Sequence, residues 1–238
     1  MTVAEATFSD VGHVVVDIEG TTSRSTYVYD VLFPYATGRF DPWLRAHAEE
    51  PEVREIVDQV RTEMGRPEAS HAEVVAALTE WVAQDRKVTP LKTLQGLVWQ
   101  EGFDSGDLMS DFYPDALVAL RRWHEAGLRI SVYSSGSVLA QRNWYAHSPE
   151  GDLTSWIDGY YDTANAGPKR EEASYTTIAE AIKLPPSSLL FCSDVVAELD
   201  AARAAGWQVV RVRRDGEPHA VEDSAHPEVG EMTAITLA

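Results

Sequence analysis

The fold follows from one stretch of the sequence, Val14-Val15-Val16-Asp17-Ile18-Glu19-Gly20-Thr21-Thr22. Its β-branched apolar run is typical of a buried strand in a parallel sheet. Ligands of open α/β sheets bind beyond the carboxyl ends of such strands, so we expect Asp17 and Glu19 at the edge of a site. Gly20 permits the turn that would redirect the second carboxylate. The alternative is an ordinary strand end with two solvated acids.

Length and composition indicate a globular protein. The 238 residues, 44% of them hydrophobic and seven of them Trp, allow one large domain or two small ones. No apolar run approaches the roughly 20 residues of a membrane span, and the N-terminal residues lack the features of a secretory signal. Cys192 is the single cysteine, which excludes an internal disulfide and predicts a cytoplasmic location. Because it lies in an apolar strand, we interpret it as a small buried residue.

The charge of the chain limits its partners. Twenty basic and 38 acidic residues give a net charge of −18, which repels nucleic acid and anionic membrane surfaces. We therefore expect neither as a partner. A phosphate-bearing ligand would need local help from a metal ion, a lysine or backbone N–H groups.

Residues from about 40 to about 105 predict a helical subdomain inserted into an α/β chain, because apolar residues recur there at helical spacing. Ser70-His71-Ala72-Glu73 has the pattern of a capping box before a helix. A further helix from Lys92 is expected to end at Gly102. The preceding segment, Tyr27 to Tyr35, is expected to be a short helix or extended chain.

Strands and helices alternate again after Phe112, which predicts right-handed βαβ units and a parallel sheet. The later predicted strands are Leu128–Tyr133, Gly159–Tyr161, Leu189–Ser193 and Gln208–Val212. The tail from Asp215 onward is acidic and carries two prolines, so we expect it to be loosely packed or partly disordered.

Polar residues follow four of these strands and should gather along one edge of the sheet. Asp17 and Asp194 suit a hard cation such as Mg²⁺, although Asp194 could instead cap the next helix. Ser134-Ser135-Gly136-Ser137 lies at a strand-to-helix turn, where N–H groups and hydroxyls can bind an anion, although serine caps are common. Lys169 could bind a phosphate or be an ordinary surface lysine.

Together these residues predict phosphoryl transfer. A carboxylate at Asp17 can attack phosphorus and form an aspartyl-phosphate. Glu19 can protonate the leaving oxygen and then activate water. The metal, the lysine and the serine donors would neutralise charge on the transferring group.

The order Asp, Ser, Lys, Asp resembles that of the haloacid-dehalogenase-like phosphatases. Several segments, which cover the chain in order up to about Arg213, further resemble the enolase-phosphatases of methionine salvage. Glu19 is the most specific, because most of the superfamily carries Asp there. The matching segments are Asp17–Thr22, Asp30–Ala36, Leu94–Trp99, Val132–Val138, Gly167–Glu171 and Ser193–Ala202.

The resemblance implies a Rossmann-like parallel-sheet core, residues 1–25 and 108–238, with an inserted helical cap, residues 26–107. It implies an Mg²⁺-dependent enolase-phosphatase that converts 2,3-diketo-5-methylthiopentyl 1-phosphate to 1,2-dihydroxy-3-keto-5-methylthiopentene and phosphate. The implied roles are nucleophile and metal ligand for Asp17, and acid/base and carbonyl metal ligand for Glu19. Phosphate or substrate binding is implied for Ser134, Ser135 and Lys169, and metal binding for Asp194. A part for Glu19 in enolisation is a further hypothesis.

The sequence departs from this family in three places. Ser23-Arg24-Ser25-Thr26 replaces a more apolar segment, and Arg24 there could alter the substrate pocket or contact phosphate. The stretch Thr163–Ala166 is about one residue longer than the corresponding stretch in the family. Arg213-Arg214-Asp215-Gly216-Glu217 replaces the usual Arg-Pro-Gly-Asn ending.

Two rival functions remain. One is a related phosphatase that acts on another small phosphorylated metabolite without enolisation; the other is a weakly catalytic protein retained for binding or regulation. We expect a monomer. The seven histidines are scattered and are interpreted as surface or cap residues. Trp81, Trp99 and Trp123 are interpreted as packing residues, whereas Lys92 and Gln95 could face the site from the cap.

Overall fold

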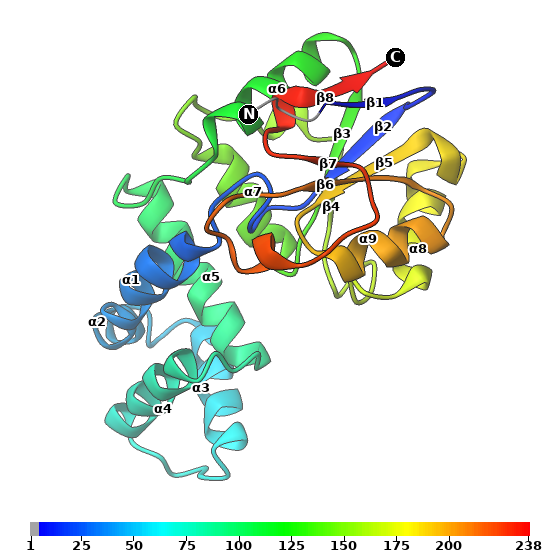
Figure 1. The fold of residues 1–238 in the computed structure, drawn as a ribbon. Coiled ribbons are helices and arrows are strands. Elements are labelled where there is room, and N and C mark those ends of the chain that lie inside the picture. The colour runs from blue at the N-terminus through cyan, green and yellow to red at the C-terminus, as the bar shows by residue number, and fades with distance from the viewer. Residues whose placement is uncertain (1–4) are drawn as a thin grey trace. The chain divides into compact units, whose positions relative to one another are not determined.

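The computed structural model describes residues 5–238, which form two compact units (Figure 1). The first contains the chain up to Thr26 together with Met109–Ala238, and the second is Tyr27–Leu108. The boundaries expected from the sequence lie within one residue of these. The assignment of the units as catalytic core and cap remains a prediction.

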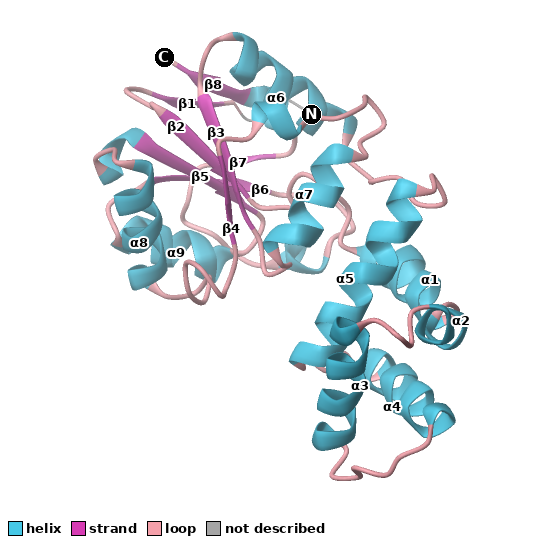
Figure 2. Ribbon diagram, turned by 180° about the vertical axis from the view of Figure 1, so that it is seen from behind, coloured by secondary structure: helices cyan, strands magenta, loops and turns pink. Residues whose placement is uncertain are grey.

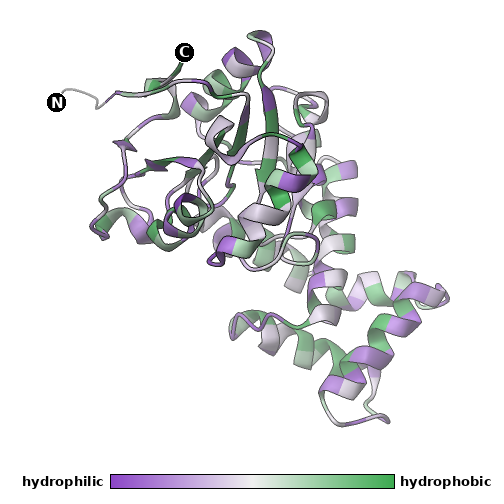
Figure 3. Cartoon of the chain, turned by 90° about the vertical axis from the view of Figure 1, so that its right-hand side faces the viewer, coloured by the Kyte–Doolittle hydropathy of each residue, from purple (hydrophilic) through white to green (hydrophobic). Residues whose placement is uncertain are grey.

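The first unit is built on a six-stranded parallel sheet with the strand order β4-β3-β2-β5-β6-β7. The predicted α/β class is thereby confirmed. The central strand β2 lies between β3 and β5, and its residues Val14, Val15 and Val16 are fully buried. Figure 3 shows the hydrophobic colouring of the central strands. The strands are β2 His13–Val16, β3 Arg129–Tyr133, β4 Gly159–Tyr161, β5 Leu189–Ser193, β6 Gln208–Val212 and β7 Glu228–Val229.

Helices cover both faces of this sheet, with α6 and α7 on the opposite side from α8 and α9 (Figures 1 and 2). Side chains of α8 and α9, such as Ile178 and Leu199, pack with Val15 and Phe191 in one hydrophobic core. This two-sided cover explains why β2 and β5 are apolar at successive positions. The helices are α6 Pro114–Glu125, α7 Val138–Ala146, α8 Glu172–Ile182 and α9 Val196–Ala204, and the short turns η2 Thr154–Trp156 and η3 Pro186–Ser188 connect them to the strands.

The second unit is entirely helical and has its own core, which includes Phe40, Leu78 and Leu94. The capping box before α4 is confirmed, because Ser70 and Glu73 each accept the other's backbone N–H. The sequence allowed either a helix or an extended chain for Tyr27 to Tyr35, and the segment is helical throughout. The elements are η1 Val28–Leu32, α1 Phe33–Thr37, α2 Phe40–Ala46, α3 Pro51–Glu63, α4 His71–Ala83 and α5 Thr89–Asp104.

The prediction that Gly102 ends a helix is wrong, because α5 continues to Asp104. A Cβ atom at Gly102 would lie 2.6 Å from the hydroxyl oxygen of Tyr35. The glycine therefore makes room for the Tyr35 ring against α5 and does not terminate the helix.

The prediction of a loosely packed or disordered tail after Asp215 is also wrong. The tail supplies β7 and then β8, Ile235–Leu237, which pairs with β1, Ala6–Phe8, after the short turns η4 Pro218–Val221 and η5 Met232–Ala234. Met232 and Ile235 are fully buried. The guanidinium group of Arg211 donates hydrogen bonds to the carbonyl oxygens of His219 and Glu222. A few buried apolar residues and one buried arginine thus order the segment from Asp215 onward, which contains six acidic residues and no Lys or Arg.

Candidate active site

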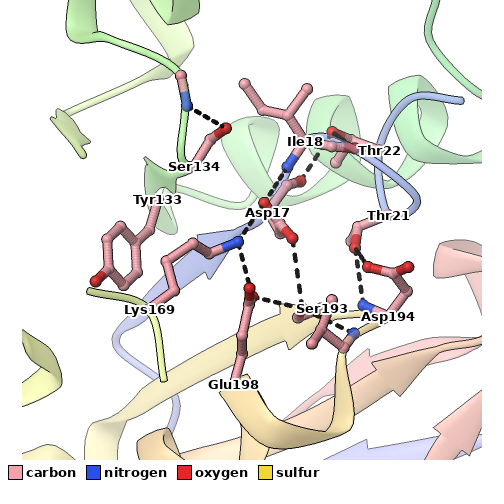
Figure 4. Close-up of polar contacts among 12 residues, drawn as sticks. Asp17, Ile18, Thr21, Thr22, Tyr133, Ser134, Lys169, Ser193, Asp194 and Glu198 are labelled. Atoms are coloured by element: carbon pink, nitrogen blue, oxygen red, sulfur yellow. Dashed lines mark hydrogen bonds and ion pairs between the residues drawn. The ribbon is translucent and has the colours of Figure 1, made fainter. Parts of the chain in front are cut away.

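Asp17 lies directly after the central strand and is 4% exposed. Its backbone N–H donates to the carbonyl oxygen of Cys192 at 3.0 Å, which extends the pairing of β2 with β5 by one residue. Its carboxylate Oδ1 accepts a hydrogen bond from the N–H of Ile18 at 2.8 Å. Asp17 is therefore held in one orientation at the middle of the sheet edge (Figure 4).

The turn after Asp17 requires glycine at position 20. Gly20 has a φ of +75°, and a Cβ atom there would lie 2.3 Å from Oδ2 of Asp194. Both the backbone conformation and this close approach exclude a side chain. The carbonyl oxygen of Ile18 accepts N–H bonds from Thr22 at 3.0 Å and Ser23 at 2.9 Å, which closes the turn. The turn thereby places the Gly20 peptide against Asp194.

Asp194 lies after β5, the strand next to β2, and is 3% exposed. Its backbone N–H donates to Oγ1 of Thr21 at 3.0 Å, and that hydroxyl donates to Oδ1 of Asp194 at 3.3 Å. The alternative interpretation of Asp194 as a helix cap is wrong, because Val195 is the N-cap of α9 and no side chain bonds there. Burial, and then the charge of Asp17, raise the pKa of Asp194 to about 7.

Lys169 lies between two buried carboxylates. Its Nζ atom is 2.7 Å from Oδ1 of Asp17 and 2.7 Å from Oε2 of Glu198 (Figure 4). Burial alone would lower the pKa of Lys169, but the two carboxylates outweigh it and the net shift is upward. The interpretation as an ordinary surface lysine is wrong, because the side chain is only 6% exposed. Tyr175 donates a hydrogen bond to the Lys169 carbonyl oxygen at 2.8 Å and so fixes its loop.

Glu198, in the first turn of α9, was missed by the sequence reasoning. It accepts a hydrogen bond from Ser193 Oγ at 3.0 Å in addition to its ion pair with Lys169. Burial raises the pKa of its carboxyl group. The available signal was its place in the first turn of the helix that follows Asp194, beside the buried Leu199.

The serines after β3 have different environments. Ser134 is buried, and its Oγ accepts the Gly136 N–H at 3.2 Å, whereas Ser135 is exposed. Ser137 is the residue that caps α7, through the Ala140 N–H at 3.2 Å. The expected serine cap therefore exists, but at Ser137, and Ser134 and Ser135 remain candidates for substrate binding.

Two further residues, also missed, hold this serine loop in place. Gln141 Nε2 donates to the carbonyl oxygens of Gly136 and Tyr161, each at 2.8 Å. Asp162 accepts the Val138 N–H at 3.0 Å at the start of α7. The loop between β3 and α7 is thus anchored from within the same unit.

Glu19 and Arg24 lie on the exposed side of the turn. The Glu19 side chain is exposed, in contrast to that of Asp17. Arg24 forms an ion pair with Asp111 at 2.6 Å, which argues against the interpretation of Arg24 as a phosphate contact. The neighbouring Ser23 is buried and accepts a hydrogen bond from Trp144 Nε1 at 2.9 Å.

The donor set fits a hard divalent cation. Two carboxylates, Asp17 and Asp194, lie at neighbouring strand ends. Burial and then the charge of Asp17 raise the pKa of Asp194, and a bound cation would favour the ionised form against both. Within residues 5–238, no group of three or more His, Cys, Asp or Glu side chains is arranged to hold a metal. One or two carboxylates are what Mg²⁺ commonly takes from a protein, with water and phosphate oxygens completing its shell.

Comparison with known proteins places these observations in a family. Residues 11–206 match the model of the haloacid dehalogenase-like hydrolases. The chain is 54% identical to enolase-phosphatase E1 of Streptomyces avermitilis, over 96% of each chain, and 51% identical to that of Frankia alni, over 94% of each. The UTR4 protein of Saccharomyces cerevisiae has a similar crystal structure, with a TM-score of 0.78 and 31% identity over 93% of this chain and 98% of that one.

Proposed function

We propose a function from one premise, which is that the chain belongs to the haloacid dehalogenase-like hydrolases and, within them, to the enolase-phosphatases. It is a phosphatase of methionine salvage. The proposed reaction enolises 2,3-diketo-5-methylthiopentyl 1-phosphate and removes its phosphate, giving 1,2-dihydroxy-3-keto-5-methylthiopentene. One observation carries the proposal: the buried cluster of Asp17, Lys169 and Asp194 at adjoining strand ends, in a chain half identical to enolase-phosphatases.

In the proposed phosphoryl transfer, a carboxylate oxygen of Asp17 forms a bond to phosphorus as the bond to the substrate oxygen breaks. Glu19 gives a proton to the departing oxygen and then takes one from the water that hydrolyses the aspartyl-phosphate. The support is geometric. Asp17 is buried and oriented by Ile18 and Lys169, whereas the Glu19 side chain is exposed to the solvent with which it would exchange protons.

We propose Mg²⁺ as the cofactor, held by the carboxylates of Asp17 and Asp194 and by the backbone carbonyl of Glu19. When bound, it neutralises charge on the transferring phosphoryl group. Lys169 and the hydroxyls of Ser134 and Ser135 are the proposed phosphate ligands. Lys169 keeps its positive charge because two carboxylates surround it, which suits a phosphate contact in a protein of net charge −18.

The decisive experiment supplies a diketo alkyl phosphate and Mg²⁺ under anaerobic conditions, and follows ultraviolet absorbance of the enediol together with phosphate release. The proposal expects both signals, with the enediol appearing no later than phosphate. Phosphate without the enediol would favour the plain phosphatase, and neither signal would favour the binding or regulatory alternative. The Glu19→Asp variant keeps the carboxylate but shortens the side chain. If this variant still enolises the substrate fully, enolisation does not need the longer Glu19 side chain.

Location and assembly are proposals of a simpler kind. In the described chain, no helix combines the length and the apolar character needed to cross a bilayer. Cys192 is the only cysteine in the sequence and is buried. We propose that the protein is cytoplasmic and monomeric. Size-exclusion chromatography coupled to light scattering would test the monomeric state, and fractionation of cells would test the location.

A further inference from the structure

Arg214 is a buried arginine, 5% exposed, whose guanidinium group bonds to the turn that follows Asp17. Its Nε and Nη2 atoms donate to the carbonyl oxygen of Thr21 at 3.1 and 2.9 Å. Its Nη1 atom is 2.9 Å from both carboxylate oxygens of Asp115 in α6. A planar guanidinium can form these bonds together, whereas a lysine ammonium cannot match their geometry. Arg214 thus ties one peptide of the turn to a helix.

Thr21 connects this anchored peptide to Asp194. Its hydroxyl is the group that donates to Oδ1 of Asp194 and accepts the Asp194 N–H. The Asp194 carboxylate also lies close to Gly20, where a Cβ atom would be 2.3 Å from Oδ2. A shift of the Thr21 peptide would therefore disturb the position of the Asp194 carboxylate.

Tyr113 supports the same turn. The Arg214 guanidinium lies over its ring, 4.1 Å from the ring centroid, and the Tyr113 N–H donates to the Thr22 carbonyl oxygen at 2.9 Å. The Tyr113 hydroxyl and both donors of Ser25 bond to Glu217. Two of the segments that depart from the family pattern, residues 23–26 and 213–217, therefore contact each other beside the turn.

We propose that Arg214 is a positioning residue for the divalent cation, which it serves by anchoring the Thr21 peptide and so keeping the Asp194 carboxylate in place. This inference rests on the proposed function, because it takes Asp194 as a cation ligand. Arg214 acts through Thr21 and is not a catalytic residue. Loss of a residue that orients a metal ligand typically weakens metal binding about 10- to 100-fold.

The test is a calorimetric titration of the full-length protein with Mg²⁺, in the absence of substrate. The proteins are the wild type, Arg214→Met, Arg214→Lys and Arg211→Met, with thermal unfolding recorded for each. Arg211 is the matched control because it is 1% exposed and also bonds within the C-terminal tail, to the Glu222 carbonyl oxygen at 2.7 Å and to Glu228 at 2.9 Å.

We expect R214M to raise the Kd for Mg²⁺ at least about tenfold, and R214K to have a Kd between those of R214M and the wild type. R211M should lower the Tm but keep a Kd within about twofold of the wild-type value. If R214M fails to fold, the R214K titration decides. An unchanged Kd in R214K or R214M, an equal rise in R211M, or no Mg²⁺ binding by the wild type would overturn the inference. The enediol assay on the wild type tests the proposed function separately.

Discussion

The two ends of β2 both carry a buried ionisable group, but they accommodate it in opposite ways. At the amino end, His13 is fully buried, so the interpretation of the histidines as surface or cap residues is wrong for this one. Its Nε2 atom lies 2.8 Å from the Ser131 hydroxyl. Burial and the nearby Arg129 lower the pKa of His13 to about 4, so the ring is neutral at pH 7. At the carboxyl end, Asp17 faces the cationic Lys169 at 2.7 Å.

The amino end of β2 buries a neutral group, whereas the carboxyl end buries charged ones. Losing the charge is the less costly solution, because buried ions lose their hydration even when they are paired. The carboxyl end nevertheless gathers Asp17, Lys169, Asp194 and Glu198, all of which are at least 90% buried. We infer that this concentration is retained for phosphoryl transfer.

Asp17→Asn should have the largest effect and remove turnover, a loss of about 10⁴-fold or more, because the amide cannot attack phosphorus. Phosphate release measures the loss, and thermal unfolding should show that the variant folds. The exposed Asp223→Asn serves as control and should keep wild-type turnover. Substantial phosphate release by D17N would mean that another group is the nucleophile.

Lys169→Met should lower kcat about 10³-fold, because it removes the proposed phosphate contact and leaves Asp17 and Glu198 facing each other. Steady-state kinetics with the phosphorylated diketone would measure this. The same change at the exposed Lys183 controls for loss of one positive charge. A K169M enzyme within tenfold of wild type would show that the charged end of β2 is structural.

At the other end of β2, His13 should make stability depend on pH. Its folded pKa of about 4 lies below the unfolded value near 6.5, so the unfolded chain binds more protons between these values. The contribution is present above pH 6.5 and is lost as the pH falls toward 4. The free energy of unfolding, measured with urea, should therefore fall between pH 7.5 and pH 5 by about 2 kcal/mol more in the wild type than in His13→Gln. Parallel pH profiles for the two proteins would contradict a buried neutral His13.

Glu198→Gln should have the smallest effect, about a tenfold loss of kcat. The amide keeps the size of the side chain and its bond to Ser193, but it no longer balances the Lys169 charge. Steady-state kinetics would compare it with Glu180→Gln on the exposed side of α8. Equal kcat values for the two variants would show that Asp17 alone is enough to balance the positive charge of Lys169.

The strand ends could be predicted from the sequence because short apolar runs reveal where strands stop. Asp17, Lys169 and Asp194 were expected at one sheet edge for that reason, and the parallel strand order places them there. Glu198 was missed because an acid in a first helical turn is usually solvated. Its burial depends on Lys169, which lies in a distant loop.

The predictions for Gly102 and for the C-terminal tail were wrong for a similar reason, because both features depend on residues far away in the chain. Gly102 carries the local signal of a helix end, but its role is to admit the Tyr35 ring. The acidic tail has the composition of a disordered segment, yet Arg211 donates hydrogen bonds to two of its carbonyl oxygens and Met232 is buried in the core. Local pattern predicts the elements, whereas close contacts between distant residues decide the remainder.

The pairing of β8 with β1 has a consequence for synthesis on the ribosome. The N–H of Ala238 donates to the Phe8 carbonyl oxygen at 2.9 Å, and Arg214 reaches Thr21 across 193 residues of chain. Translation proceeds at roughly 5–20 residues per second, so the apolar β2 emerges many seconds before β5 can pair with it. During that time a nascent chain presents a central strand whose β5 edge is unpaired, and chaperones can bind it. Prematurely terminated chains should lack the site altogether, so we expect no partly active fragments from truncated translation.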